Sequence, residues 1–310
     1  MINKSILLFV CLVAGGAAYA ASSETDTMTA AAMTAAEFDA SLKYRQGDIV
    51  LPNDVATLAI PANFRYLGPE DAERVLVQAW GNPPGHKTLG MIFPSAVSPL
   101  SLEGWGIVVT YEEDGYVSDD DADGIDYDAL LVQMKEGIAA ANEERKKQGY
   151  GTLELVGWAA KPYYDKETHK MYWAKEIAFG GAPTHTLNYN IRILGRQGVL
   201  VLNAISDISQ LAEIKQDMPQ VLAFTNFNKG HRYEDFDSST DKVAAYGIAG
   251  LVAGGLAAKA GLFTKLLALL IAGKKFIVLI VIGLLVFVGT LFKRKKAAKN
   301  PLTDTIPKKG

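Results

Sequence analysis

The 310-residue sequence contains a single cysteine, Cys11, and only four histidines. Cys11 lies in an apolar run near the N-terminus, so the rest of the chain can form neither an internal disulfide nor a thiolate metal site. No histidine has a second histidine one helical turn away with a glutamate between them, which is the arrangement that zinc hydrolases use. The sequence therefore excludes a disulfide framework and the common helical zinc motif.

Other catalytic signatures are missing as well. The chain has no nucleophile elbow, no phosphate-binding glycine loop and no dinucleotide-binding glycine pattern. Residues 239–242 read Ser-Thr-Asp-Lys, as in serine–lysine acyltransferases, but the partner Lys-Thr-Gly motif is absent. Because catalytic groups need only meet in space, an envelope enzyme of the hydrolase or acyltransferase type remains the alternative function. We assign no catalytic residue and no cofactor from the sequence.

The N-terminal region predicts export. Lys4 precedes an apolar run at residues 6–18, and residues 18–20 read Ala-Tyr-Ala, so residues 1–20 are expected to be a signal peptide. Residues 21–46 are rich in alanine, threonine and serine, and we expect a linker there. Between residues 21 and 258 the chain carries 33 acidic and 19 basic side chains, a formal charge of −14. This charge disfavours nucleic acid as a partner.

The C-terminal region predicts a membrane anchor. Residues 276–292 form an uncharged apolar run of 17 residues with basic clusters on both sides, which is typical of a transmembrane helix. The tail at residues 293–310 carries seven Lys or Arg residues against one Asp, so the positive-inside rule places this tail in the cytoplasm. The expected protein is single-pass, with residues 47–237 forming a domain outside the cytoplasm.

Residues 238–275 are rich in glycine and alanine, and Lys259 and Lys265 interrupt the apolar stretch at 243–272 within them. Gly250, Gly254 and Ala258 are four residues apart, and small residues at this spacing allow helices to approach closely in lipid. We expect an amphipathic juxtamembrane helix, with a second membrane crossing as the alternative. These three residues are candidates for self-association or for contact with a membrane protein.

The region between the linker and this segment alternates strand and helix patterns. Apolar and β-branched stretches bounded by Gly or Pro predict strands, and helical spacing of apolar residues predicts helices. The alternation at residues 185–193 predicts a half-buried antiparallel strand with one polar face. We expect residues 162–165 to form a hairpin turn and Pro219 to follow the last helix. The predicted strands are 48–51, 56–60, 89–93, 105–111, 153–159, 170–177, 185–193 and 199–205, and the predicted helices are 69–79, 127–148 and 207–218.

This pattern predicts an α+β fold, an antiparallel sheet with helices packed against one face. An α-β-α sandwich is the alternative, because the element order resembles that of the Mog1 and PsbP type of sandwich.

An acidic stretch precedes the longest predicted helix. Asp119, Asp121 and Asp123 are two residues apart and are followed by glycine, as in the first half of a calcium loop. The twelfth position is Leu130 instead of the closing glutamate, and a strand rather than a helix precedes the stretch. The three aspartates are therefore weak calcium candidates, and we predict no metal site.

Helix capping is the competing explanation for these aspartates. Ser118 with Asp121 resembles a capping box, and Asp126 is placed to cap the long helix. We favour capping because it accounts for more of the acidic residues.

Aromatic residues gather around the predicted hairpin: Trp158, Tyr163, Tyr164, Tyr172 and Trp173. This density suits contact with carbohydrate, peptide or protein. Packing into the core is the alternative, since large aromatic side chains are mostly buried. We select Tyr163 and Tyr164 as candidate interaction residues because their exposure distinguishes the two interpretations.

Short blocks along the chain carry a family resemblance. They are NFRYL at 63–67, WGNPP at 80–84, LGMIFP at 89–94, YVSDD at 116–120, IDY at 125–127, LVGWA at 155–159, YWAKE at 172–176, LNYNIR at 187–192 and AYGI at 245–248. Together with the terminal span, they resemble a family of bacterial membrane-anchored proteins, the domain of unknown function 2167. The resemblance implies an envelope protein with no assigned activity and no catalytic residues to transfer. We therefore expect a non-enzymatic binding or protein-interaction module on the outer, periplasmic side of the bacterial inner membrane.

Overall fold

The computed structural model describes residues 34–82, 84–101, 104–147 and 149–254. The predicted signal peptide, transmembrane helix and basic tail, together with Ala258, lie outside these residues. Within the described part of the chain, no helix is both long enough and apolar enough to cross a membrane.

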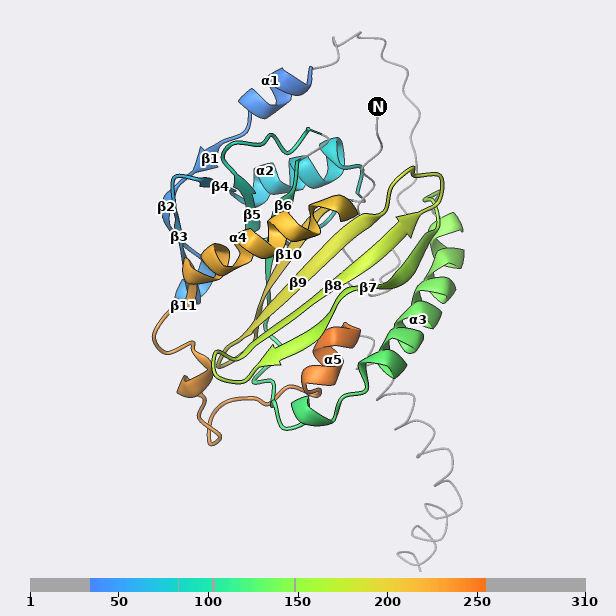
Figure 1. The fold of residues 1–310 in the computed structure, drawn as a ribbon. Helices are drawn as coiled ribbons and strands as arrows, with labels where there is room; N and C mark the ends of the chain where they lie inside the picture. The colour runs from blue at the N-terminus through green and yellow to red at the C-terminus, as the bar shows by residue number, and fades with distance from the viewer. Residues whose placement is uncertain (1–33, 83, 102–103, 148, 255–310) are drawn as a thin grey trace, which may run out of the picture. The chain divides into compact units, whose positions relative to one another are not determined.

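An antiparallel sheet of eight strands forms the centre of the described domain (Figure 1), which confirms the α+β prediction. A three-stranded sheet with the order β11-β3-β2 lies beside it. The strands of the large sheet, in spatial order, are β1 (Tyr44–Arg45), β4 (Phe64–Leu67), β5 (Gly90–Pro94), β6 (Gly106–Glu112), β10 (Val199–Asp207), β9 (Thr186–Leu194), β8 (Lys170–Phe179) and β7 (Leu153–Asp165). The small sheet contains β2 (Gly47–Val50), β3 (Ala56–Ile60) and β11 (Thr225–Phe227).

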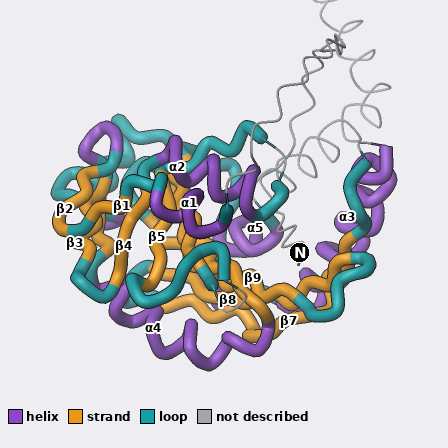
Figure 2. Tube along the Cα trace, turned by 90° about the horizontal axis from the view of Figure 1, so that it is seen from above, coloured by secondary structure: helices purple, strands orange, loops and turns teal. Residues whose placement is uncertain are grey.

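Helices cover both faces of the large sheet, rather than the single face that the sequence predicted. Figure 2 shows α4 on one side, which we call the front face, and α1, α2 and α5 on the other, the back face. The helices are α1 (Ala35–Ala40), α2 (Pro69–Arg74, continuing as a π-helical turn to Ala79), α3 (Tyr127–Lys147), α4 (Leu211–Ala223) and α5 (Ile248–Ala253). The α-β-α arrangement is therefore the one observed.

The front face holds the largest hydrophobic core. Ile214, Met218 and Val221 of α4 are buried against apolar side chains of β4, β5, β6, β9 and β10, and the small sheet packs into the same core. Burying such a side chain stabilises the fold by about 1.5–3 kcal/mol. The back face instead carries separate apolar clusters under α2, under α5 and under α3.

Helix boundaries follow local capping chemistry. Pro69 occupies the first turn of α2 after Gly68, as predicted. Asp126 caps α3, because its Oδ1 accepts hydrogen bonds from the backbone N–H groups of Asp128 at 3.1 Å and Ala129 at 3.0 Å. The predicted cap for the long helix is thus confirmed.

Two turn predictions based on proline are wrong. Strand β7 continues through residues 162–165, and the β7–β8 turn comes later, at residues 166–169. Proline is tolerated in β7 because this strand lies at the sheet edge, where one set of backbone groups needs no partner. Pro219 lies inside α4, on its exposed side, while Met218 and Val221 hold the helix on the core.

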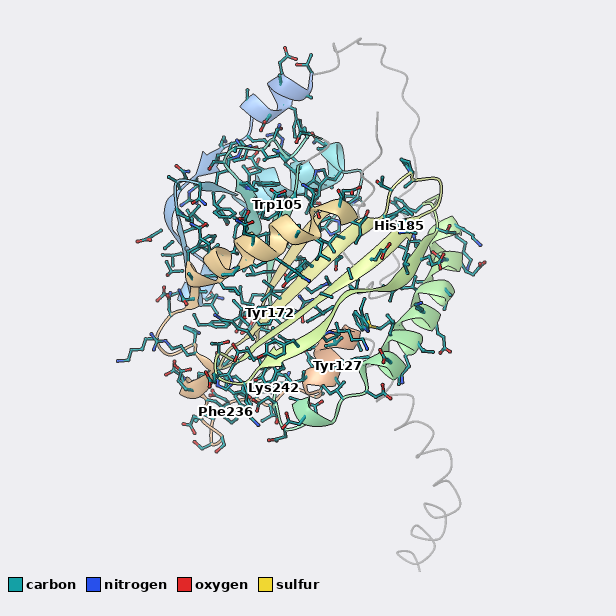
Figure 3. All side chains as sticks on the ribbon, in the orientation of Figure 1. Trp105, Tyr127, Tyr172, His185, Phe236 and Lys242 are labelled. Carbon is teal, nitrogen blue, oxygen red and sulfur yellow. The ribbon has the colours of Figure 1, made fainter. Side chains whose placement is uncertain are left out.

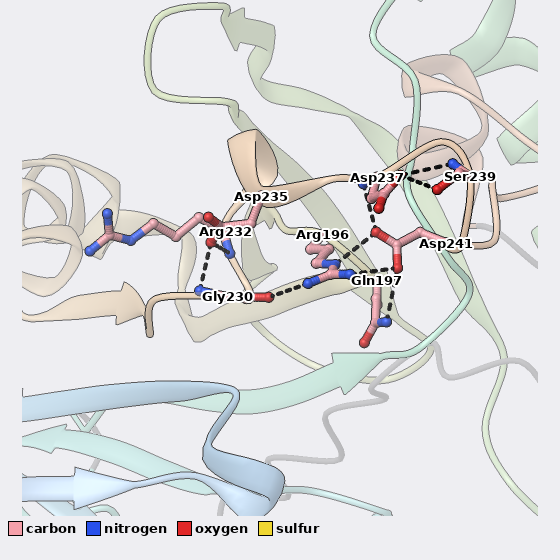
Figure 4. A network of polar contacts seen from close by, with 8 residues as sticks. All are labelled: Arg196, Gln197, Gly230, Arg232, Asp235, Asp237, Ser239 and Asp241. Carbon is pink, nitrogen blue, oxygen red and sulfur yellow. Dashed lines mark hydrogen bonds and ion pairs between the residues drawn. The ribbon is translucent and has the colours of Figure 1, made fainter.

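Residues 228–254 return to the domain after β11, so the boundary that we expected at 237 falls inside a packed segment. Figure 4 shows the network that holds it. Arg196 binds Asp241 through two hydrogen bonds, Nε–Oδ2 at 2.7 Å and Nη2–Oδ1 at 3.0 Å, and Asp241 Oδ2 also accepts the N–H of Asp237 at 2.8 Å. The hydrogen bonds from Arg196, before all other causes, lower the pKa of Asp241 to about 2. Nearby, Phe236 and Lys242 lie at the same end of the sheet in Figure 3.

Candidate functional site

Five polar side chains occupy neighbouring positions on the back face of β8, β9 and β10. We call them the polar floor: Lys175, Asn188, Asn190, Arg192 and Asn203. Lys175 is directly opposite Asn188, and Asn190 is directly opposite Asn203. Residues that pair across antiparallel strands project to the same face, so these side chains share one surface.

The polar floor corrects the prediction for this strand. The sequence predicted a half-buried strand whose polar side faces water, but β9 is buried on both faces from Leu187 to Leu194. The exposed fractions of Asn188, Asn190 and Arg192 are 5%, 1% and 9%. Lys175 is only partly buried, so the floor stays accessible from that side.

Apolar clusters surround the polar floor. The cluster under α2 includes Ile205, the cluster under α5 includes Trp173, and the cluster under α3 includes Ile177. In Figure 2, α5 lies over β8 and β9, with α2 on one side and α3 on the other. The polar residues thus lie between these apolar clusters.

The carboxamides of the floor bind one another. Asn190 Nδ2 donates to Asn188 Oδ1 at 2.8 Å and to the Asn188 carbonyl at 2.9 Å. Arg192 Nη1 donates to Asn203 Oδ1 at 3.3 Å and to the Ile191 carbonyl at 3.2 Å. These contacts orient the floor but bring no negative charge to Arg192.

The two cations of the floor have no direct ion-pair partner among the described residues, although the charge of Glu112 acts on Arg192 from a greater distance. Neither Lys175 nor Arg192 forms an ion pair with a described carboxylate. The guanidinium carbon of Arg192 lies 5.0 Å from the centre of the Trp173 ring. Burial lowers the pKa of Arg192. Burial, and secondly the charge of Arg192, lowers the pKa of Lys175 to about 8.

The contacts of Arg192 offset the cost of burying it by an amount of similar order. A buried ion without a partner costs several kcal/mol. A desolvated cation–π contact returns about 2 kcal/mol, and the two long hydrogen bonds to neutral oxygens about 1 kcal/mol each. The indole Nε1 of Trp173 is also buried without a hydrogen-bond partner, which adds about 1–3 kcal/mol. The back face therefore offers strong unpaired donors to an acceptor from outside.

A second polar cluster joins the β7–β8 turn to the loop before α3. The Tyr164 hydroxyl donates to Asp119 Oδ2 at 2.8 Å and lies 3.2 Å from His169 Nδ1. The His169 ring stacks on Tyr233 at 4.0 Å between centroids. Burial, and then the contact with Asp119, raises the pKa of Tyr164. His169 has a φ of 52°, which the tight turn requires. This cluster ties three distant segments together.

The two candidate tyrosines do not form one surface. Tyr163 is 64% exposed and stacks on Tyr172 of the neighbouring strand, with ring centroids 6.4 Å apart. Tyr172, labelled in Figure 3, packs against the front core, whereas Tyr164 packs with the back-face cluster under α5. Trp173 is fully buried, so for this residue the core interpretation holds.

The three candidate calcium ligands have separate positions. Asp119 binds Tyr164, whereas Asp121 accepts hydrogen bonds from the backbone N–H groups of Ile248 at 2.8 Å and Ala249 at 3.1 Å. Asp123 is exposed. Among the described residues, no group of three or more His, Cys, Asp or Glu side chains is placed to hold a metal ion.

Asp121 caps α5 across 127 residues of sequence. The capping box that we expected between Ser118 and Asp121 is absent from the described contacts, since Ser118 Oγ donates to Asp120 Oδ2 at 2.6 Å. A Cβ at Gly247 would lie 2.5 Å from Asp121 Oδ1, so a side chain at this position would displace the Asp121 carboxylate.

The glycine segment packs on the domain as far as it is described. Gly250 lies in α5, where a Cβ would approach the Cβ of Tyr246 to 2.6 Å. The helix ends at Ala253, and Gly254 has a φ of 86°. Gly250 and Gly254 therefore do not share one helical face, and Ala258 lies outside the described residues.

The sequence patterns did not predict the polar floor. Lys175, Asn188, Asn190 and Arg192 all lie in the YWAKE and LNYNIR blocks that carry the family resemblance. We attributed the polar positions of the second block to solvent exposure. A usable signal was present, because a row of carboxamides with an arginine differs from the Lys, Glu and Thr typical of a solvated strand face.

Solved structures with distant similarity to the chain include the following two. Cyanobacterial PsbP (CyanoP) from Synechocystis sp. PCC 6803 has 11% identity and a TM-score of 0.33, with 61% of this chain and 94% of that chain covered. The Ran-binding protein Mog1p from Saccharomyces cerevisiae has 11% identity and a TM-score of 0.30, with 60% and 96% covered. No curated protein matches the chain. The family model described as protein of unknown function (DUF2167) matches residues 43–285, and the chain belongs to this family.

Proposed function

We propose that the domain is a non-enzymatic binding module that holds an anionic ligand on the polar floor. The ligand carries a carboxylate or phosphate group. The observation that carries the proposal is Arg192, a buried guanidinium without an ion pair to any described carboxylate. The planar fork of arginine suits bidentate contact with either group.

The surroundings of Arg192 support an anion rather than a neutral ligand. Lys175 supplies a second positive charge, and Trp173 supplies an indole N–H without a partner. An anion accepts from these donors and offsets the cost of burying the cations. The net negative charge of the rest of the domain makes such a site selective, because it repels anions that make no specific contact.

Thermal unfolding of the purified full-length chain tests this proposal. Phosphate, malonate and pyruvate are titrated against sodium chloride at matched ionic strength. A ligand at ten times its Kd adds about 1.4 kcal/mol, which corresponds to roughly 3–6 °C for a domain of this size. We expect at least one of these anions to stabilise the wild type in this way.

Arg192→Lys keeps the charge and removes the planar fork, so it should weaken binding at least about ten-fold. Arg232→Lys is the matched control, because Arg232 is exposed and pairs with Glu234 at 3.7 Å. The proposal fails if no anion exceeds sodium chloride, or if the two variants behave alike.

We also propose that this module is displayed on the periplasmic side of the bacterial inner membrane, with its C-terminal tail in the cytoplasm. The support is the sequence: the apolar run at 276–292 and the basic tail after it. Protease added outside spheroplasts should digest the domain and leave a tag after Gly310 intact. Digestion of the tag would reverse this topology. Crosslinking of the full chain in its membrane tests self-association.

A further inference from the structure

Lys175 is placed to act as a nucleophile. Its Nζ makes no hydrogen bond or ion pair with any described residue, although its side chain is only partly exposed. Its back-face neighbours along β8 are Trp173 and Ile177, which are 1% and 8% exposed. An amine that is accessible yet flanked by apolar side chains and close to another cation is the usual setting of a reactive lysine.

Arg192 extends toward Lys175. Arg192 pairs with Met171 in the sheet register, yet its guanidinium carbon lies over the ring of Trp173, two residues nearer to Lys175 along β8. The charge of Arg192 also contributes to lowering the pKa of Lys175. A ligand with a carboxylate next to an electrophilic carbon can therefore engage both side chains.

We infer that Lys175 attaches covalently and reversibly to the carbonyl carbon of a 2-oxo acid whose carboxylate is held by Arg192. This inference rests on the proposed function, since it needs the floor to bind an anion. It adds a ligand class, the 2-oxo acids, and a chemical step.

The step requires no oxidant and no further reactant. The neutral amine of Lys175 attacks the carbonyl carbon, a C–N bond forms, and the carbonyl electron pair moves to oxygen. A proton passes from nitrogen to that oxygen, which gives a carbinolamine. Loss of the hydroxyl group as water, with a second proton from the nitrogen, leaves an imine. Addition of water reverses the step.

The environment makes this step feasible near neutral pH. Because burial and the charge of Arg192 lower the pKa of Lys175 to about 8, about a quarter of the amine is neutral at pH 7.5. For an ordinary lysine with a pKa near 10.4, the neutral fraction is about 0.1%. The difference is on the order of 100-fold in reactive amine.

Reductive trapping tests the inference. The purified full-length chain is incubated with pyruvate and cyanoborohydride, which reduces an imine to a stable secondary amine, and the adducts are located by peptide mass spectrometry. We expect Lys175 to be modified at least about ten-fold faster than Lys161, as its larger neutral fraction requires. Lys161 is an exposed lysine that pairs with Asp128 at 3.1 Å. The rate at Lys175 should rise with pH and level off above about 8.

Matched variants separate specific capture from general lysine chemistry. Lys175→Arg keeps the charge and should abolish the main adduct, and Lys175→Met serves if the arginine variant fails to fold. Arg192→Lys should lower the yield at Lys175, whereas Lys161→Arg should leave it unchanged. Lactate, which has the carboxylate but no carbonyl, should compete with pyruvate without forming an adduct.

The outcomes distinguish the two proposals. Adducts spread evenly over the lysines would overturn the inference. Stabilisation by lactate and pyruvate without an adduct at Lys175 would overturn the covalent step and leave the anion site intact. If phosphate, malonate, lactate and pyruvate all fail to stabilise the chain and no adduct forms, both proposals fail.

Discussion

Asp121→Ala is the sharpest test of how the C-terminal segment is held. The carboxylate accepts two backbone hydrogen bonds, from Ile248 and Ala249, and thereby satisfies the first turn of α5. Loss of an N-cap side chain typically costs about 1 kcal/mol, and up to about 2. Because both oxygens of Asp121 are used, we expect about 2 kcal/mol lost from the free energy of unfolding. This corresponds to a fall of roughly 4–8 °C in Tm for a domain of this size.

The assay is urea and thermal unfolding of the full-length chain, with Asp123→Ala as the control. Asp123 lies two residues away and forms no described hydrogen bond or ion pair, so its removal should change stability by less than about 0.5 kcal/mol. Equal effects of the two variants would refute the capping role. Repeating the melts at millimolar calcium tests the competing assignment, since a calcium loop predicts stabilisation that is lost in both variants.

Three further predictions follow from particular contacts. Tyr164→Phe removes a hydroxyl that donates a hydrogen bond to the Asp119 carboxylate, so it should lower the free energy of unfolding in urea by about 1–2 kcal/mol. Tyr163→Phe changes an exposed ring and should leave this free energy almost unchanged. Equal losses in the two variants would contradict the role of the Tyr164 hydroxyl. The pKa of Lys175 is lowered from 10.5 to about 8, so the free-energy cost of burying its charge is complete below pH 8 and absent above pH 10.5. Lys175→Met should therefore be up to about 3 kcal/mol more stable than the wild type at pH 7, and this difference should disappear as the pH rises to 10.5. A stability difference that does not depend on pH would refute the linkage. Gly250→Ala should destabilise the domain by about 1–3 kcal/mol through overpacking. Gly137→Ala in α3 should stabilise it by about 0.5–1 kcal/mol, because no atom lies within 4 Å of the position that the new Cβ would take. A change in stability of the same sign in both variants would contradict the packing of α5.

Patterns that depend on local chemistry were predictable from the sequence. The strand at 56–60, the long helix after Asp126 and the strands flanking the turn at 195–198 all occur as predicted. In each case the prediction depends on the spacing of residues along the element itself or on a cap at its end. The fold class followed from their order.

Features that depend on distant contacts were not predictable. Pro162 and Pro219 were predicted to end a strand and a helix. Pro162 lies in the edge strand β7, where the missing N–H is tolerated. Pro219 lies within α4, which the burial of Met218 and Val221 holds on the core. The strand Phe64–Leu67 was also missed. Asn190 looked like a solvent-facing residue, since alternation reveals which residues share a face but not what covers that face.

The attachment of residues 238–254 has a mechanical consequence. Tension on the chain beyond Gly254 reaches α5 and its cap at Asp121 first, and then the backbone pairing of Tyr116 with Lys242 and Ala244. The link between Arg196 and Asp241 follows. These attachments are therefore loaded before the hydrogen bonds between the strands of the large sheet. The 17 residues of the segment, fully extended, span about 55–60 Å at roughly 3.3–3.6 Å each, which is the length of chain that their detachment would release.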